Sequence, residues 1–263
     1  MVNKTRYGIG KTDTVDAHRI AAAVLPLTTD YLHHPRLFEG HPVALKILLT
    51  ARDEITRERT RAVNALTALV RAIDLSLDAR RALSKAQIAE VAGWRSRQEP
   101  LEAPIARAEA VRLAKRIHHA ETDLKTNYAA ITALVADSPA AGLTREIGIG
   151  PVTAATALVA WSHLRRLRNE AAFAALAGTS PLPASSCKTT RYRLNRGGDR
   201  QLNRALNVVA MVRMVHDPQT RAYVEKRRPD GKADREIPRI LKRYLARRIY
   251  RHFNNATVLE RRG

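Results

Sequence analysis

The sequence predicts a mainly α-helical protein, and three observations support this fold class. Aromatic residues make up only 5% of the 263 residues while alanine is abundant, which favours packed helices over a sandwich of sheets. Hydrophobic residues make up 45% of the chain, which is enough for the core of one or two domains. In two long stretches the apolar residues recur at steps of three and four, the spacing of one helix face. No apolar run reaches the length of a membrane-spanning helix, about 18 residues.

The first 30 residues predict a short basic segment followed by a small helix. Either Thr12 or Asp13 is placed to cap this helix, the alanine-rich run Asp16–Leu25 continues it, and Pro26 ends it. Residues 31–42 then predict a loop, because they contain two prolines, three histidines and a glycine.

Two long amphipathic helices are predicted next. The first extends from Val43 to about Ile73, and its apolar stripe is interrupted by Arg52 and Arg59. The second stripe extends from Val111 to Val135. Three helix-breaking residues separate the stripes: Gly93, Pro100 and Pro104. The pattern fits a coiled-coil arm of two antiparallel helices that also mediates dimerisation, and it fits an ordinary helical bundle equally well.

The chain changes character from Ala141 onward. Glycine-rich turns occur at Gly148–Gly150 and Gly197–Gly198, and a loop of prolines and serines, Ser180–Cys187, lies between helical runs. The sequence therefore divides into three predicted parts: residues 1–30, a helical insertion at 31–140, and a C-terminal domain at 141–263.

The net charge of +21 predicts a nucleic-acid partner, because neutralising phosphates releases counterions. An anionic membrane surface is the alternative, but it requires bulky apolar anchors that are scarce here. The basic residues gather between Arg191 and Arg251, where a helix from about Ile237 has one apolar and one cationic face. We expect phosphate contacts from Lys188, Arg191, Arg193, Arg196, Arg200 and Arg204.

Cysteine and histidine usage gives little support for a metal site. The single cysteine, Cys187, excludes an internal disulfide and indicates a reducing compartment, most simply the cytoplasm. Histidines occur at His33-His34 and His118-His119 without a partner at ligand spacing, so we expect them to be solvated.

The segment from Ile147 to Ala155, Ile-Gly-Ile-Gly-Pro-Val-Thr-Ala-Ala, predicts a helix-hairpin-helix element. Glycine allows a tight turn, and the free N–H groups at a helix start bind phosphate, which makes Gly148, Gly150 and Thr153 candidate DNA contacts. A plain turn between two helices fits the same residues.

Two serines, Ser185 and Ser186, precede the basic run that starts at Lys188. A serine beside cations can attack a phosphodiester, because the cations stabilise the charge that develops on the phosphoryl group. Solvated turn residues fit the same pattern, and no histidine lies nearby in the sequence to act as a base.

Asp13 and Asp16 lie one helical turn apart, so both carboxylates share a face. Such a pair can bind Mg²⁺. In isolation, however, the two residues fit an N-cap and a first-turn acid that the helix dipole favours.

Taken in order, the motifs resemble one family. The order is Gly-Lys-Thr-Asp-x-x-Asp-Ala, a helical arm, Gly-Ile-Gly-Pro-x-Thr-Ala, Ala-Gly-x-Ser-Pro with Ser-Ser, and Arg-Gly-Gly-Asp. From Lys4 onward the chain resembles the IS-one-ten family of insertion-sequence transposases, relatives of the Piv and MooV DNA invertases.

The resemblance implies roles for these residues. The family has a RuvC-like domain of ribonuclease-H fold, and the last two of its four metal carboxylates match Asp13 and Asp16, which would hold Mg²⁺. Its catalytic serine precedes a glycine, so Ser186 is the better match and Ser185 the second, with Cys187 in place of that glycine. Family members are bacterial and act on DNA as oligomers, guided by a bridge RNA, which implies a cytoplasmic protein associated with the nucleoid.

The position of the aspartate motif predicts a shortened protein. The family's other two metal carboxylates lie upstream, but only ten residues precede Lys11 here. A ribonuclease-H sheet needs on the order of a hundred residues, so we expect residues 1–30 to be a remnant of that domain. We therefore expect a DNA transposase that is inactive by itself. The alternatives are a non-catalytic DNA- or RNA-binding remnant and a scaffold that dimerises through the arm.

Overall fold

The computed structural model describes residues 12–28, 35–36, 39–183, 192–193, 195, 197–227, 229 and 236–260. These residues form helices and one pair of two-residue strands, which confirms the mainly α fold class. The elements in chain order are α1 (Asp13–Val24), α2 (Gly40–Ala72), α3 (Lys85–Ala92), α4 (Glu102–Ala136), the 3₁₀ helix η2 (Ala141–Arg145), α5 (Pro151–Trp161), α6 (Glu170–Leu176), β1 (Leu182–Pro183), β2 (Tyr192–Arg193), α7 (Arg200–His216), α8 (Pro218–Arg227) and α9 (Ile237–Glu260). Among the described residues, no helix is long and apolar enough to cross a membrane.

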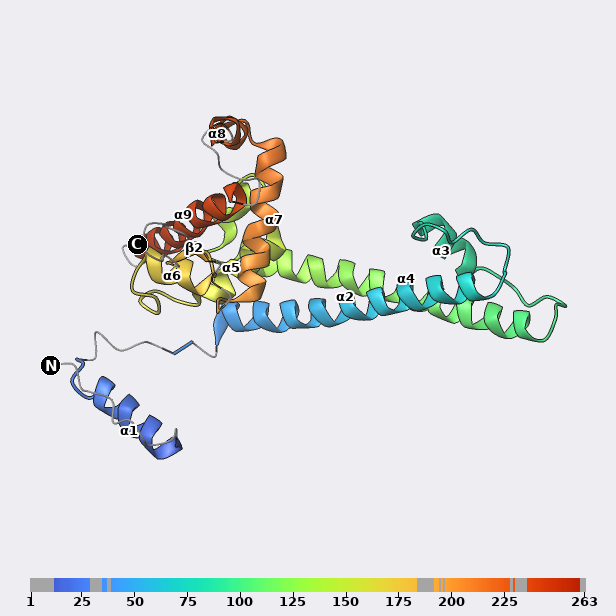
Figure 1. Ribbon diagram of the computed structural model, residues 1–263, viewed down its shortest axis with the longest axis horizontal. Coiled ribbons are helices and arrows are strands. Elements are labelled where there is room, and N and C mark those ends of the chain that lie inside the picture. Colours follow the sequence, from blue (N-terminus) through green and yellow to red (C-terminus); the bar gives the residue numbers. More distant parts are fainter. Residues whose placement is uncertain are drawn as a thin grey trace.

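Helix α1 begins where the sequence predicts it. Thr12 is the N-cap, and its Oγ1 accepts a hydrogen bond from the Val15 N–H at 3.3 Å, which decides between the two predicted caps. The helix buries none of its residues, and it lies apart from the other helices in Figure 1. Ile20 and Val24 of the helix are therefore exposed, as are Leu25 and Leu27 directly after it.

Helices α2 and α4 form an antiparallel pair that projects from the other helices as a long arm (Figure 1). The structure shows the two long antiparallel helices, and dimerisation through them stays a prediction. Arg52 and Arg59, which interrupt the apolar stripe, join the two helices. Arg52 Nη1 donates to the Leu124 carbonyl at 3.2 Å, and Arg59 pairs with Glu121 at 2.7 Å. The coiled-coil geometry of this pair stays a prediction.

The far end of the arm has a small core of its own. Helix α3 packs on α4 there, and the buried side chains include Leu66, Ile88 and Ile117. Gly93 ends α3, a short helix that the apolar stripes did not predict, and Pro104 lies in the first turn of α4 instead of breaking the chain. Proline is tolerated there because the first N–H groups of a helix have no partner within it.

The C-terminal body consists of α5, α6, α7 and α9, with α8 beside α7 (Figure 1). Alanine-rich α5 lies in its core, because small side chains let neighbouring helices approach closely. At its end, Trp161 stacks on Phe253 of α9 with ring centroids 5.0 Å apart. Leu45 and Ile131, at the near ends of the arm helices, are buried in the same core, so the arm is rooted in the body.

Candidate nucleic-acid interface

The two predicted nucleophiles, Ser185 and Ser186, lie outside the described residues, as do Cys187, Lys188, Arg191 and Arg196. The structure shows the two ends of their segment instead. Strands β1 and β2 pair antiparallel, with Leu182 opposite Arg193 and Pro183 opposite Tyr192. The chain therefore leaves and returns at one place, which we call the loop base and define as residues 176–183, 192–193, 195 and 197–199.

Two motifs that are separate in the sequence meet at the loop base. A Cβ atom added at Gly198 would lie 2.6 Å from Gly178 Cα and 2.8 Å from the Leu176 carbonyl oxygen, so only glycine fits there. Gly178 itself has a φ of +64°, which favours glycine. The Asp199 N–H donates to the Leu176 carbonyl at 2.6 Å, and the Asp199 carboxylate caps α7 by accepting from the Leu202 N–H.

Side chains of helix α9 also contact the loop base, directly and through Asn203. Lys242 is buried, and its Nζ donates to Asn203 Oδ1 at 3.1 Å. Asn203 Nδ2 in turn donates to the Ala177 carbonyl at 2.7 Å. Arg243 donates to Ser180 Oγ at 2.7 Å. Burial, and then the nearby Arg239 charge, lower the pKa of Lys242 below its ordinary value of 10.5.

A second group of cations lies near the start of α7. Arg166 donates to the Ala160 carbonyl at 2.6 Å, and its pKa is lowered by burial and then by the positive charge of Arg36. Arg36 lies 3.9 Å from the Asp199 carboxylate. Sequence reasoning did not single out Arg36, Arg166 or Asn203, because no local spacing links these residues before the chain is folded.

Six arginines of the C-terminal body form two contrasting sets. Arg200 and Arg204 are exposed on α7, and no described residue forms an ion pair with either. Four others are paired with acids: Arg213 and Arg248 with Glu146, and Arg247 and Arg251 with Glu170. These carboxylates neutralise part of the basic charge of the C-terminal part.

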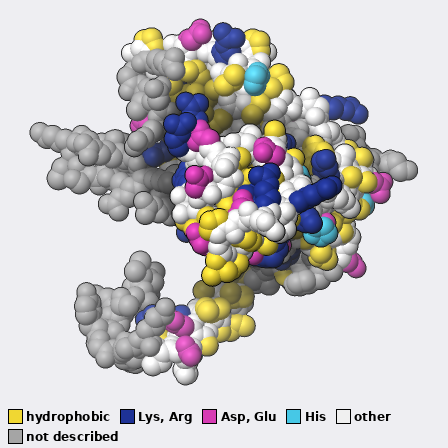
Figure 2. Space-filling view, turned by 90° about the vertical axis from the view of Figure 1, so that its right-hand side faces the viewer, with side chains coloured by type: hydrophobic (Ala, Val, Ile, Leu, Met, Phe, Trp, Pro, Cys, Tyr) yellow, Lys and Arg dark blue, Asp and Glu magenta, His cyan; other side chains and the backbone are white. Residues whose placement is uncertain are grey.

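Acidic and basic side chains are also mixed on the side of the molecule toward which the arm projects. Figure 2 shows its Lys and Arg side chains interspersed with Asp and Glu, without one continuous basic field. Within and between the arm helices, arginines pair with acids, such as Arg116 with Glu58 at 2.7 Å and Arg112 with Glu109 at 2.6 Å. Exposed arginines without an acid partner are thus the better candidates for phosphate contacts.

The glycine turn before α5 is built against α7. Gly148 has a φ of +82°, and a Cβ atom there would lie 3.3 Å from the Val209 carbonyl oxygen. Arg213 donates to the Ile147 carbonyl at 2.9 Å. Gly150 is the N-cap of α5, with open space around it. The element before the turn is the 3₁₀ helix η2, so the helix-hairpin-helix and the phosphate contacts of Gly150 and Thr153 stay predictions.

The predicted metal ligands Asp13 and Asp16 lie in the first turn of α1. Among the described residues, no group of three or more His, Cys, Asp or Glu side chains could hold a metal ion. Two carboxylates from one helical turn supply only part of the six ligands that Mg²⁺ requires in an octahedral site. The described residues therefore do not fit a complete protein site for Mg²⁺.

Comparison with known proteins bears on the segment that contains the loop base. Residues 141–225 match the family model described as Transposase IS116/IS110/IS902 family. This segment begins at η2 and ends in α8, so it includes the glycine turn, the loop base, Arg200 and Arg204. A comparison with curated proteins gave no match. The match supports an insertion-sequence transposase, and residues 141–225 of this chain are similar to that family.

Proposed function

We propose that this chain is the nucleic-acid-binding part of an insertion-sequence transposase, and that the C-terminal body contacts DNA phosphates at the start of α7. The observation that carries the proposal is the exposure of Arg200 and Arg204, which have no ion-pair partner among the described residues and lie directly after the loop base. Both belong to the segment that matches the transposase family. Guanidinium groups bind phosphate through two parallel hydrogen bonds, which suits them to this role.

The salt dependence of DNA binding tests this proposal. If both arginines contact phosphates, the Arg200→Ala/Arg204→Ala variant should reduce the slope of log affinity against log salt by about 1.8, because each phosphate contact on duplex DNA contributes about 0.9. Fluorescence anisotropy with a labelled duplex measures the slope. The control is Arg247→Ala/Arg251→Ala, which removes two arginines that already pair with Glu170. Equal slopes for the two double variants would contradict the proposal.

The catalytic part of the proposal is that Ser186, or Ser185 as the second choice, attacks DNA in the complete transposase. The serine Oγ would form a bond to phosphorus while the bond to the leaving strand's oxygen breaks, and the serine proton would end on that oxygen. The segment that matches the family model contains the loop base, where β1 and β2 bring both ends of the serine segment to one place. This supports the assignment. In such a protein Asp13 and Asp16 would be two of the metal ligands.

Serine substitutions separate the two candidates. In a protein completed with the upstream part of the family, Ser186→Ala should abolish recombination and leave DNA affinity unchanged, since alanine removes only the nucleophile. Recombination assays and anisotropy on the same preparations provide both readouts. Recombination that survives Ser186→Ala but not Ser185→Ala would show that the choice of serine is wrong.

A guide RNA and self-association belong to the same proposal. The arm formed by α2 and α4 projects from the body, and Ile47 near its root and Ile105 near its far end are exposed. Self-association through the arm would cover such side chains. The non-catalytic remnant remains the alternative function, and it predicts binding without recombination even in a completed protein.

A further inference from the structure

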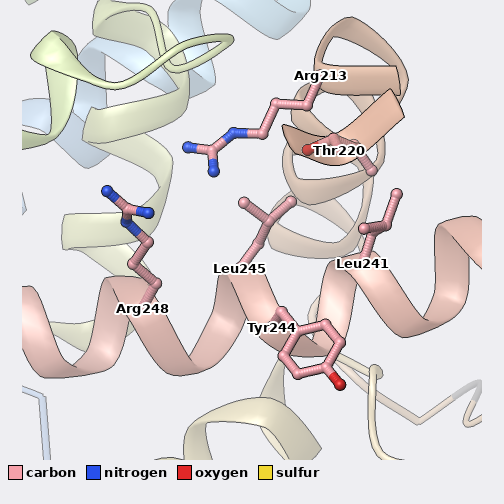
Figure 3. Close-up of a pocket in the computed structure, with 7 residues that line it drawn as sticks. Arg213, Thr220, Leu241, Tyr244, Leu245 and Arg248 are labelled. Atoms are coloured by element: carbon pink, nitrogen blue, oxygen red, sulfur yellow. The ribbon is translucent and has the colours of Figure 1, made fainter. Parts of the chain in front are cut away.

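A pocket lies between α7, α8 and α9, away from the loop base (Figure 3). Its floor is apolar, because Ala210 and Leu245 are buried and Leu241 packs against the body core. Figure 3 shows the guanidinium groups of Arg213 from α7 and Arg248 from α9 next to each other, at one side of this floor. An apolar floor with cations at the rim suits a ligand that is part apolar and part anionic.

The rim keeps a positive charge after its internal pairing. Glu146 accepts from Arg213 Nη2 at 2.6 Å and from Arg248 Nε at 2.7 Å, so one carboxylate faces two guanidinium groups. The side chain of Arg248 is 63% exposed. Because Arg248 donates to Glu146 through Nε, its terminal NH₂ groups remain available for an anion from solution.

Tyr244 adds an aromatic wall at the outer edge of the pocket. Its ring lies edge-on to that of Tyr223, with centroids 6.2 Å apart, and this contact orients it. Tyr244 is nevertheless 50% exposed. It lies one helical turn before Arg248 on α9, so both side chains border the same pocket.

We propose that this pocket binds an unpaired nucleotide of a single-stranded nucleic acid. The base would lie against Tyr244 and the apolar floor, and the adjoining phosphate would bind Arg248. Stacking on an aromatic side chain together with a backbone cation is the usual means of binding single strands. Paired bases are stacked inside a duplex and cannot enter, so the pocket distinguishes single strands from duplexes. The inference rests on the proposed nucleic-acid function. It adds that the bound nucleic acid is single-stranded and that it binds in this pocket.

The test compares the affinity of the full chain for two labelled probes at one salt concentration. The probes are an oligothymidine of about 12 nucleotides, within the range of single-strand site sizes, and a duplex of the same length. Tyr244→Ala should weaken oligothymidine binding about ten-fold, the loss typical of one stacked base. It should leave the duplex affinity unchanged. Tyr244→Phe keeps the ring and should bind like the wild type.

The cation has a matched control on the same helix. Arg251 is exposed like Arg248, at 68%, but it contacts Glu170 through both Nε and Nη2, whereas Arg248 donates to Glu146 through Nε. Arg248→Ala should reduce the salt slope for oligothymidine by about 0.7, the contribution of one single-strand phosphate contact. Arg251→Ala should leave it unchanged.

Two results would overturn the inference while leaving the proposed function intact. One is an equal loss of affinity for oligothymidine and duplex on Tyr244→Ala, and the other is no loss for either probe. A Tyr244→Ala variant that loses affinity for an acidic peptide but not for oligothymidine would assign the pocket to a protein partner instead. If the wild type binds neither nucleic-acid probe, the proposed function itself is wrong.

Discussion

At the scale of single residues, glycine and small polar side chains decide how the loop base is built. Gly178 and Gly198 come from two sequence motifs 20 residues apart, and their backbones touch. Asp199 caps α7, and Asn203 connects the Lys242 ammonium to a backbone carbonyl of the loop base. The sequence shows that glycine and aspartate are suited to turns and caps there. It does not show which backbone the glycine must approach, because that contact exists only after α6 and α7 have packed.

Gly198→Ala should lower the free energy of unfolding by about 1–3 kcal/mol, the usual cost of forcing an extra carbon into a tightly packed place. The new methyl group would meet the Gly178 backbone, which cannot move aside like a flexible side chain. Urea denaturation followed by circular dichroism measures the change. Gly197→Ala is the control, since its nearest described neighbour, Asn195 Oδ1, is 3.5 Å away. Equal destabilisation by both variants would refute the close-packing explanation.

At the scale of elements, the arm shows how polar residues can specify a helix pair. The spacing of apolar residues predicts both long helices, but Arg52 and Arg59 interrupt the apolar stripe of the first one. In the structure each of them contacts α4, through the Leu124 carbonyl and the Glu121 carboxylate. Partners 62 and 72 residues away cannot be found from a local pattern. The same holds at the arm's far end, where Arg107 is 5% exposed, pairs with Glu99 and lies over the Trp94 ring.

Arg107→Ala should loosen the end of the arm and leave the C-terminal body unchanged. The substitution removes two charge-assisted hydrogen bonds to Glu99 and the contact with Trp94. We expect amide hydrogen exchange in α3 and the start of α4 to become about ten-fold faster or more, with α5 and α7 unaffected. The matched control is Arg112→Ala on the same helix, whose pair with Glu109 is exposed. Faster exchange in α5 and α7 after Arg107→Ala would show that the two cores unfold together.

At the scale of the whole molecule, the chain has one body, one arm rooted in its core, and α1 lying apart from both (Figure 1). The net charge of +21 predicts an anionic partner, but the fold distributes that charge unevenly. Glu146 and Glu170 each engage two arginines of the basic C-terminal part, while Arg200 and Arg204 remain exposed. Which arginines can bind phosphate thus depends on where two carboxylates lie in the folded protein.

The sequence by itself determined the helical fold class, the presence of two long helices, a helix cap at Thr12 or Asp13 and the excess of positive charge, because each follows from local spacing or from composition. The tertiary structure alone decided the contact of Gly178 with Gly198, the burial of Lys242, the pairing of four arginines, and the pocket between α7, α8 and α9. These features join residues far apart in the chain. Their energies depend on burial and close approach, and both arise only when the helices pack.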